Sequence, residues 1–230
     1  MKLNVEIPDV IVRRLDALAG ASGRSAEDLA REALDSFLGS PRARRAILKA
    51  RRAAAGPEGC SLADLGWLDG YTGQTIDELL IYEGTDEVHS ILFALETAID
   101  EKAKSAGPLR VTGVEVIVQS VLALEREVNN GGYDQYFRNS SRRYAPMVVN
   151  HLFSIGSAEI ADITQRALDS LGIPKISVPA IEAEMQRENV QRDRALNRCD
   201  LEFYEQKGLL ERLFTYVKAH QDGIRILSRT

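Results

Sequence analysis

Apolar and polar residues alternate over residues 2–7, and a proline follows at position 8. This pattern predicts a half-buried β-strand that ends at Pro8. Beyond it the apolar positions recur at helical spacing, first over residues 9–20 and then over residues 25–38. Ser25 is a suitable N-cap for the second helix, because Asp28 follows three residues later. The first forty residues therefore predict one strand and two helices.

A single strand leaves its backbone hydrogen bonds unpaired, and forty residues bury little apolar surface. Pairing of two chains through their strands solves both problems, so we expect a homodimer. The order strand, helix, helix over residues 2–38 resembles the ribbon-helix-helix family of Arc-like and CopG-like repressors and antitoxins. The resemblance implies a two-stranded ribbon that enters the major groove of duplex DNA.

In such a complex the polar side of the ribbon would face the base edges. The resemblance assigns this role to Lys2, Asn4 and Glu6, and it assigns phosphate contacts to Arg24 and Ser25 at the start of the second helix. Glu6 departs from the expected pattern, because a carboxylate repels phosphate. This residue therefore either specifies a base or weakens DNA binding. The alternative is a unit that only dimerises.

Residues 40–56 predict a further helix, which begins at Ser40-Pro41 and stops at Gly56-Pro57. Its bulky apolar residues are only Ile47 and Leu48, so most of the helix is expected to be solvated. The helix is either an arm that contacts DNA phosphates or a solvated spacer. Its basic residues, which would make those contacts, are Arg42, Arg44, Arg45, Lys49, Arg51 and Arg52. The linker that follows, up to residue 69, brings Trp67 and Leu68, which we expect to pack onto the next domain.

From residue 70 onward only helical periodicity is present. Thr75 with Glu78, and Thr112 with Glu115, form capping boxes that start two helices. Apolar stripes predict further helices over 88–99, 112–130, 145–156, 157–172, 180–206 and 209–217. The predicted fold is mainly α: a dimeric ribbon-helix-helix unit (1–39) with one short N-terminal strand, a basic helix and linker (40–69), and an all-α domain (70–230).

Charge is distributed unevenly along the chain. Residues 1–60 contain 11 Lys and Arg against 8 Asp and Glu, a net charge of +3, whereas residues 61–230 contain 18 against 26, a net charge of −8. Between Cys60 and Glu101 there are ten acids and no Lys or Arg. Such a segment predicts an acidic surface for a protein partner, although amphipathic helices usually keep acids on their wet face. The candidate residues are Asp77, Glu78, Glu83, Asp86, Glu87, Glu96, Asp100 and Glu101.

Residues 127–139 read EVNNGGYDQYFRN. This motif, together with its flanks over about 70–220, resembles the bacterial DNA-mimic protein 19 family. The resemblance implies a helical acidic protein that binds a transcription factor in the place of DNA. From the residues themselves we expect a helix–helix corner with a positive-φ turn at Gly131-Gly132, where Gln135 and Asn139 satisfy the backbone. The motif residues given this structural role are Asn129, Asn130, Gly131, Gly132, Tyr133, Gln135, Tyr136, Phe137 and Asn139.

The sequence favours binding over catalysis. The two cysteines and three histidines are scattered, so we expect no metal site, no disulfide and no cofactor. The corner motif has no nucleophile with an adjacent base, and we therefore expect no enzyme. No apolar run is long enough to span a membrane, and the N-terminus has no signal peptide. A cytoplasmic protein is the expectation.

The combined hypothesis is a homodimeric DNA-binding transcriptional regulator. Its acidic helical domain would bind a protein partner, either a transcription factor or a toxin, or would compete with DNA for the basic segment 42–52. Two alternatives remain. One is a type II antitoxin-like protein, and the other is a DNA mimic that binds a transcription factor and not DNA.

Overall fold

The computed structural model describes Val12, residues 19–20 and 25–31, and residues 66–226. The chain divides into two compact units, Met1–Leu65 and Gly66–Thr230. In the first unit residues 26–31 are helical, and the Asp28 backbone N–H donates to Ser25 Oγ at 3.1 Å. Ser25 therefore caps this helix as predicted. The strand expected over residues 2–8 and the basic helix expected over residues 40–56 lie outside the described residues.

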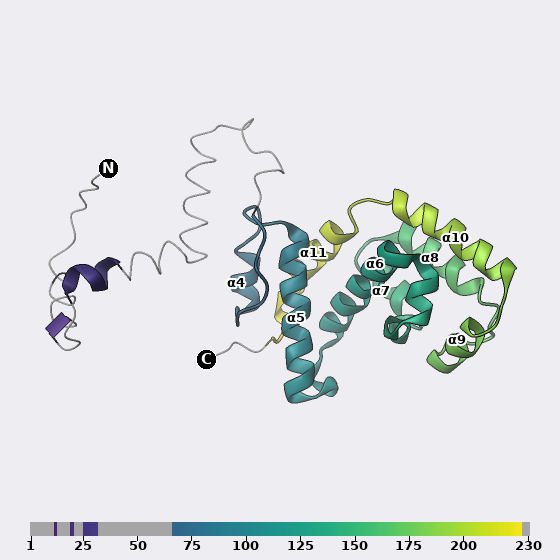
Figure 1. Ribbon diagram of the computed structural model, residues 1–230, viewed down its shortest axis with the longest axis horizontal. Helices are drawn as coiled ribbons and strands as arrows, with labels where there is room; N and C mark the ends of the chain where they lie inside the picture. Colours follow the sequence, from purple (N-terminus) through teal and green to yellow (C-terminus); the bar gives the residue numbers. More distant parts are fainter. Residues whose placement is uncertain (1–11, 13–18, 21–24, 32–65, 227–230) are drawn as a thin grey trace. The chain divides into compact units, whose positions relative to one another are not determined.

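The second unit is built from helices (Figure 1). Within residues 66–226 the only β-pairing is two isolated bridges, which join Asp86 to Gly66 and to Glu83. The all-α prediction is thus confirmed for this part of the chain. The α-helices are α4 (Ile76–Leu80), α5 (Val88–Ala106), α6 (Gly113–Arg138), α7 (Val148–Ser154), α8 (Ala158–Asp169), α9 (Val178–Met185), α10 (Val190–Glu205) and α11 (Leu209–Ala219), with short 3₁₀ helices η2 (Pro108–Arg110), η3 (Ser140–Tyr144) and η4 (Gln221–Gly223).

Local sequence signals set several helix ends. The side chains of Thr75 and Thr112 each accept a hydrogen bond from the backbone N–H of the glutamate three residues later. Each glutamate carboxylate in turn accepts the backbone N–H of its threonine. Both predicted capping boxes are therefore confirmed. Gly156 and Gly172 follow α7 and α8 with φ of +73° and +63°, a region that favours glycine.

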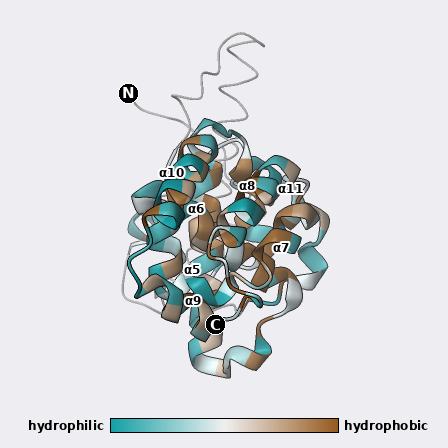
Figure 2. Ribbon diagram, turned by 90° about the vertical axis from the view of Figure 1, so that its right-hand side faces the viewer, coloured by the Kyte–Doolittle hydropathy of each residue, from teal (hydrophilic) through white to brown (hydrophobic). Residues whose placement is uncertain are grey.

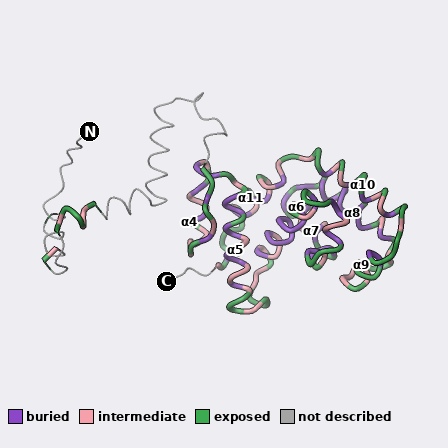
Figure 3. The backbone as a smooth tube through the Cα atoms, viewed as in Figure 1, coloured by how far each residue is buried: buried purple, intermediate pink, exposed green. Residues whose placement is uncertain are grey.

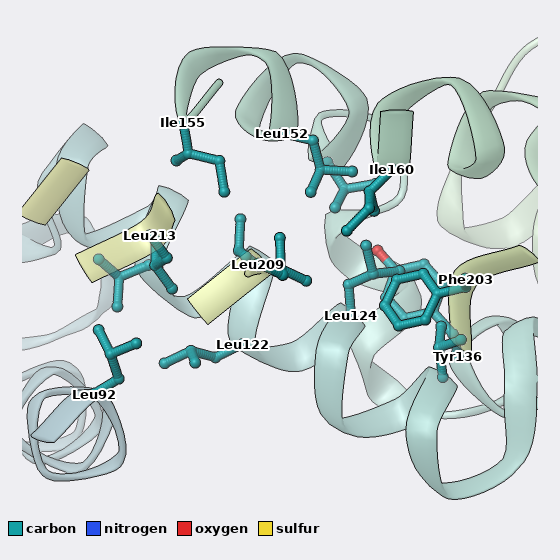
Figure 4. Close-up of a cluster of buried hydrophobic side chains, with 14 of the residues drawn as sticks. Leu92, Leu122, Leu124, Tyr136, Leu152, Ile155, Ile160, Phe203, Leu209 and Leu213 are labelled. Carbon is teal, nitrogen blue, oxygen red and sulfur yellow. The ribbon is translucent and has the colours of Figure 1, made fainter. Parts of the chain in front are cut away.

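Helix α6 is the centre of the unit, because it packs against α5, α7, α9, α10 and α11. Buried residues follow its length and the inner sides of α5 and α8 (Figure 3). Figure 2 shows the same division by hydropathy, with hydrophobic residues on α6 and α7 and a largely hydrophilic α10. Leu92, Leu122, Leu152 and Leu213 meet in one cluster from four helices (Figure 4). The interior is thus a single core around α6.

The prediction of one long helix over residues 180–206 is wrong. The structure has α9 and α10 with a break at residues 186–189. Arg192 is 2% exposed and donates to the carbonyl oxygens of Glu184 at 2.6 Å and Arg187 at 3.1 Å. Asn189 then caps α10 by accepting the Arg192 backbone N–H at 3.0 Å. The guanidinium satisfies the carbonyls that a continuous helix would have used, so the break costs little.

A buried ion pair joins the end of α5 to the start of α6. Lys102 Nζ donates to both carboxylate oxygens of Glu115 at 2.8 and 2.6 Å, and the two side chains are 5% and 0% exposed. The same carboxylate accepts the backbone N–H groups of Thr112 and Arg225 at 2.8 and 2.7 Å. Glu115 therefore connects α5, the start of α6 and the C-terminal segment through one fully paired carboxylate.

Candidate partner-binding site

The helix–helix corner lies inside α6, at its two glycines. Gly131 is extended, with φ −165° and ψ 25°, whereas Gly132 has φ +73° and ψ −175°, a combination that only glycine adopts readily. The predicted corner is confirmed, but only Gly132 supplies the positive φ. Asp200 of α10 accepts the Tyr133 backbone N–H at 2.7 Å and so caps the helix that restarts there. Burial raises the pKa of Asp200. This hydrogen bond lowers the pKa, but it offsets only part of the rise.

The side chains of Gln135 and Asn139 bond to a carboxylate rather than to the turn's backbone, so that part of the prediction is wrong. Both amides donate to Glu127 Oε2, at 2.8 and 2.7 Å, and Ser141 Oγ donates to Glu127 Oε1 at 2.9 Å. Burial raises the pKa of Glu127, but the three hydrogen bonds outweigh it and the net shift is downward. Glu127 therefore ties the helix before the corner to the residues after it.

The aromatic residues of the motif pack into the core as predicted. Tyr133, Tyr136 and Phe137 are each 0% exposed. The Tyr133 hydroxyl forms a 2.7 Å hydrogen bond with Thr164 Oγ1 on α8, and its ring lies edge-on to Phe203 on α10. The motif thus serves to fix the angle between the two halves of α6 against α8 and α10. Its contacts are those of a structural element.

A cleft of about 630 Å³ lies beside this corner, and we call it the α5–α6 cleft. Residues at i, i+4 and i+7 on α5 form one wall, and residues at i, i+3, i+4, i+7 and i+8 on α6 form the other. The segment 67–70 closes one side; the backbone N–H of Leu68 is fixed by Ser90 Oγ at 3.1 Å. Its lining residues are Trp67, Leu68, Asp69, Gly70, His89, Phe93, Glu96, Leu122, Glu125, Arg126, Asn129 and Asn130.

Two aromatic side chains in the α5–α6 cleft are open to solvent. Trp67 is 52% exposed and Phe93 is 49% exposed, while Leu68 beside them is 6% exposed. The Trp67 ring packs edge-on against His89, with centroids 5.7 Å apart. The expectation that both residues pack onto the domain is confirmed, Leu68 by burial and Trp67 by its contact with His89 of α5, although Trp67 stays half exposed. Its neighbour anchors the segment, so the indole is held in the cleft wall with half its surface free.

Carboxylates outnumber cations in the α5–α6 cleft. Arg126 donates twice to Glu96, at 3.1 and 2.9 Å, so these two charges offset each other. Burial is the largest single influence on the pKa of Arg126 and lowers it. The hydrogen bond and the charge of Glu96 together outweigh burial, so the net shift of the pKa is upward. Asp69 is exposed, and Glu125 accepts the Asn129 amide at 2.8 Å. The remaining charge of the lining is therefore negative.

A smaller hollow of about 200 Å³ adjoins the cleft, and both are lined by Glu125 and Asn129. Its other walls come from the end of α10 and the start of α11, including Tyr204 and Glu211. Tyr204 is 48% exposed and its hydroxyl donates to the Val128 carbonyl oxygen at 3.0 Å. The two hollows are therefore neighbours on α6, one on the side of α5 and the other on the side of the α10–α11 junction.

The acids proposed as a partner surface have different environments. Asp86 is 5% exposed and accepts Thr85 Oγ1 at 2.7 Å, so it belongs to the interior and not to a surface. Glu78 is occupied in its capping box, and Glu83 pairs with Lys218 at 2.6 Å. Glu96 pairs with Arg126, and Asp100 accepts the Gln119 amide at 2.7 Å. Asp77 and Glu87 are exposed, and Glu101 is partly exposed.

The residues proposed for DNA contact are almost all outside the described part of the chain. Ser25 is exposed and carries the helix cap; it is the one member of that set whose environment is defined. Lys2, Asn4, Glu6, Arg24 and the basic residues from Arg42 to Arg52 are not among the described residues. Their role stays a prediction from sequence.

Within residues 66–226 and the short described segments before them, no cluster of His, Cys, Asp and Glu is arranged to hold a metal ion. Cys199 is buried, and burial raises the pKa of its thiol, which disfavours the reactive thiolate. His151 forms a 2.6 Å hydrogen bond with Ser120, and burial lowers the pKa of its imidazole. In the described helices none is long and apolar enough to cross a membrane.

The arrangement defines a helical domain with a half-open aromatic cleft and an acid-rich rim. Comparison with known families places residues 110–220 in the family described as DMP19-like protein. The chain therefore carries a DMP19-like domain over this range, as the motif at 127–139 suggested. No curated protein matches the chain, and no solved structure matches it.

The α5–α6 cleft itself was missed at the level of sequence. A signal for it existed, because Phe93 lies off the apolar stripe of Val88, Ile91, Leu92, Leu95 and Ile99. An aromatic residue on the wet face of an amphipathic helix is a candidate contact residue. The spacing of His89, Phe93 and Glu96 would have placed them on one face.

Proposed function

We propose that the protein is a regulator whose helical domain binds a DNA-binding protein in the place of DNA. The observation that carries this proposal is the DMP19-like domain at residues 110–220, embedded in a unit with an excess of acids. A rigid scaffold is required, because carboxylates imitate phosphates only when their spacing is fixed. The single core around α6 and the Glu127 and Glu115 networks supply such a scaffold.

The carboxylates best placed to imitate phosphates are exposed ones that the fold does not use in a cap or a hydrogen bond. Asp77 and Glu87 are exposed and come from α4 and the start of α5. Glu83 and Glu96 are partly neutralised by Lys218 and Arg126. The pair of Glu83 with Lys218 is exposed, and such pairs are weak, at about 0–1 kcal/mol, so a cationic partner can replace the lysine.

The test uses the immobilised full-length chain and a lysate of the native host. A protein that binds in the place of DNA is released by duplex DNA and not by the same volume of buffer at equal ionic strength. The released protein is then identified, and its DNA binding is measured with and without this chain. The double variant Asp77→Asn/Glu87→Gln should weaken inhibition, while Glu188→Gln, an exposed acid far along the sequence, should not. Retention of the partner in the presence of excess duplex would refute the proposal.

A DNA-binding role for the N-terminal unit is a separate part of the proposal. It is supported by the resemblance of residues 2–38 to ribbon-helix-helix repressors and by the Ser25 cap. If the unit binds DNA, affinity for duplex DNA falls steeply with salt, and Lys2→Ala/Asn4→Ala abolishes it. Absence of salt-dependent binding by the unmodified chain would leave a DNA mimic that dimerises through its N-terminus. A toxin as the captured partner would instead favour the antitoxin hypothesis.

A further inference from the structure

We propose that the α5–α6 cleft and the adjoining hollow bind an extended segment of a partner protein in which arginine or lysine alternates with large apolar residues. This proposal rests on the proposed function, in that the helical domain binds a protein. It goes beyond that function, because an aromatic cleft does not imitate a phosphate backbone. It names the chemistry of the segment that the domain recognises.

The aromatic surface is the first observation. Several large apolar side chains of residues 66–226 are exposed, but Trp67 and Phe93, at 52% and 49%, are exposed together in one cleft. The wall that carries Trp67 is fixed, since the Gly66 backbone pairs with Thr85 and Glu87 at 2.7 and 2.9 Å. A rigid exposed aromatic pair binds an apolar side chain at low entropic cost.

The charge of the lining selects among apolar segments. Arg126 is the only Lys or Arg that lines the cleft, and it is held in two hydrogen bonds by Glu96. Asp69 and Glu125 then have no cation among the lining residues to offset them. A guanidinium or ammonium placed here meets carboxylates at its head and the Trp67 or Phe93 ring face along its stem. An acidic segment is repelled by these carboxylates, and a purely apolar segment gains only the contact with the rings.

The position of the two hollows selects an extended segment rather than a compact ligand. Glu125 and Asn129 line both the 630 Å³ cleft and the 200 Å³ hollow, so one chain can occupy the two in succession. The smaller hollow adds a third half-exposed aromatic, Tyr204, and another acid, Glu211. Each hollow thus combines a half-exposed aromatic residue with acids, which matches a segment that combines large apolar with basic residues.

Trp67 makes the test direct, because it is the only tryptophan of the chain. The probe is a synthetic nonapeptide that alternates arginine and leucine, titrated into the full-length protein at fixed salt. We expect saturable quenching or a blue shift of Trp67 emission. Two control peptides replace every arginine by glutamate or every leucine by serine, and both should bind at least tenfold more weakly. Calorimetry on the same samples gives the affinity independently of fluorescence.

Matched variants locate the binding. Phe93→Ala should weaken the peptide's affinity about tenfold, which corresponds to about 1.4 kcal/mol. Phe153→Ala is its control, because Phe153 is 50% exposed on α7 and lies outside both hollows. Glu125→Gln keeps an acceptor for Asn129 but removes the charge, and it should weaken binding several-fold. Asp162→Asn, an exposed acid of α8 outside both hollows, should not.

The results separate this proposal from the proposed function. Equal affinity for the glutamate peptide, no binding of the arginine–leucine peptide, or equal losses in Phe93→Ala and Phe153→Ala would overturn the cleft proposal. The duplex-DNA release experiment would still decide the function, since it depends on Asp77 and Glu87 rather than on Phe93. Conversely, peptide binding in the cleft without release of any partner by duplex DNA would support the cleft and overturn DNA replacement.

Discussion

Gly132→Ala should destabilise the helical unit more than any other single methyl group added to its glycines. The backbone of Gly132 has φ +73° and ψ −175°. A Cβ on this residue would also lie 2.7 Å from Cγ of Asp200, which is closer than carbon atoms approach without a shift. The substitution therefore combines backbone strain with displacement of the carboxylate that caps the second half of α6.

The magnitude follows from these two contributions. A non-glycine residue in this region of φ and ψ costs about 1–3 kcal/mol. Displacement of Asp200 removes its 2.7 Å hydrogen bond from the Tyr133 backbone N–H, which adds about 1–2 kcal/mol because the group is only partly buried. The expected loss is about 2–5 kcal/mol. For a domain of this size each kcal/mol lowers Tm by roughly 2–4 °C, so we expect a fall of roughly 4–20 °C.

The free energy of unfolding would be measured in urea on the full-length chain, with the helical signal followed by circular dichroism. Gly113→Ala in the same helix is the control: its added Cβ meets nothing within 4 Å, and alanine favours helix, so stability should change by less than about 1 kcal/mol. In the double variant Gly132→Ala/Asp200→Ala the overlap is relieved. Its loss of stability should therefore be smaller than the sum of the losses in the two single variants. A Gly132→Ala variant as stable as Gly113→Ala would refute the argument.

Three further predictions concern paired side chains. Lys102→Met leaves the Glu115 carboxylate buried without its cation, so urea unfolding should show a loss of about 3–5 kcal/mol; a loss under 1 kcal/mol would contradict the buried pair. Because hydrogen bonds lower the pKa of Glu127 in the folded state, its contribution is complete above the unfolded value of about 4.5 and is lost as pH falls through the folded value; Glu127→Ala should flatten that acid dependence of Tm. Burial lowers the pKa of His151 below 6.5, so stability should also fall as pH drops from 6.5 toward the folded value. If stability falls as steeply with pH in His151→Asn, His151 is not the cause of the fall.

Local signals in the sequence predicted the helix starts at Thr75 and Thr112 and the corner at Gly131-Gly132, because caps and turns depend on neighbours within four residues. Long-range partners could not be predicted in the same way. Gln135 and Asn139 bond to Glu127 only because the corner folds the chain back across 8 and 12 positions. The break before α10 depends on the buried guanidinium of Arg192, which is an unremarkable charged residue in the sequence.

The α5–α6 cleft could not be predicted from sequence either, because it too depends on long-range packing. Its walls come from segments that each look ordinary, and a depression exists only after α5 and α6 pack beside segment 67–70. The exposure of Trp67 is a tertiary property: hydrophobicity predicts burial, while in the fold the indole packs only edge-on against His89 and stays 52% exposed. Residue type therefore indicated which side chains are candidates for contact, and tertiary packing decided which of them stay exposed in the cleft.

The Glu115 carboxylate also sets an order for biosynthesis. At the start of α6, Glu115 accepts the backbone N–H of Arg225, which lies 110 positions later. The Thr112 hydroxyl donates to the carbonyl oxygen of Gly223, which lies 111 positions later. At ribosomal rates of 5–20 residues per second, the helix start waits roughly 5–20 s for these residues to be made. The unit thus cannot close while its C-terminal residues are still inside the ribosome, and a nascent chain that stalls before residue 225 carries an unfinished core.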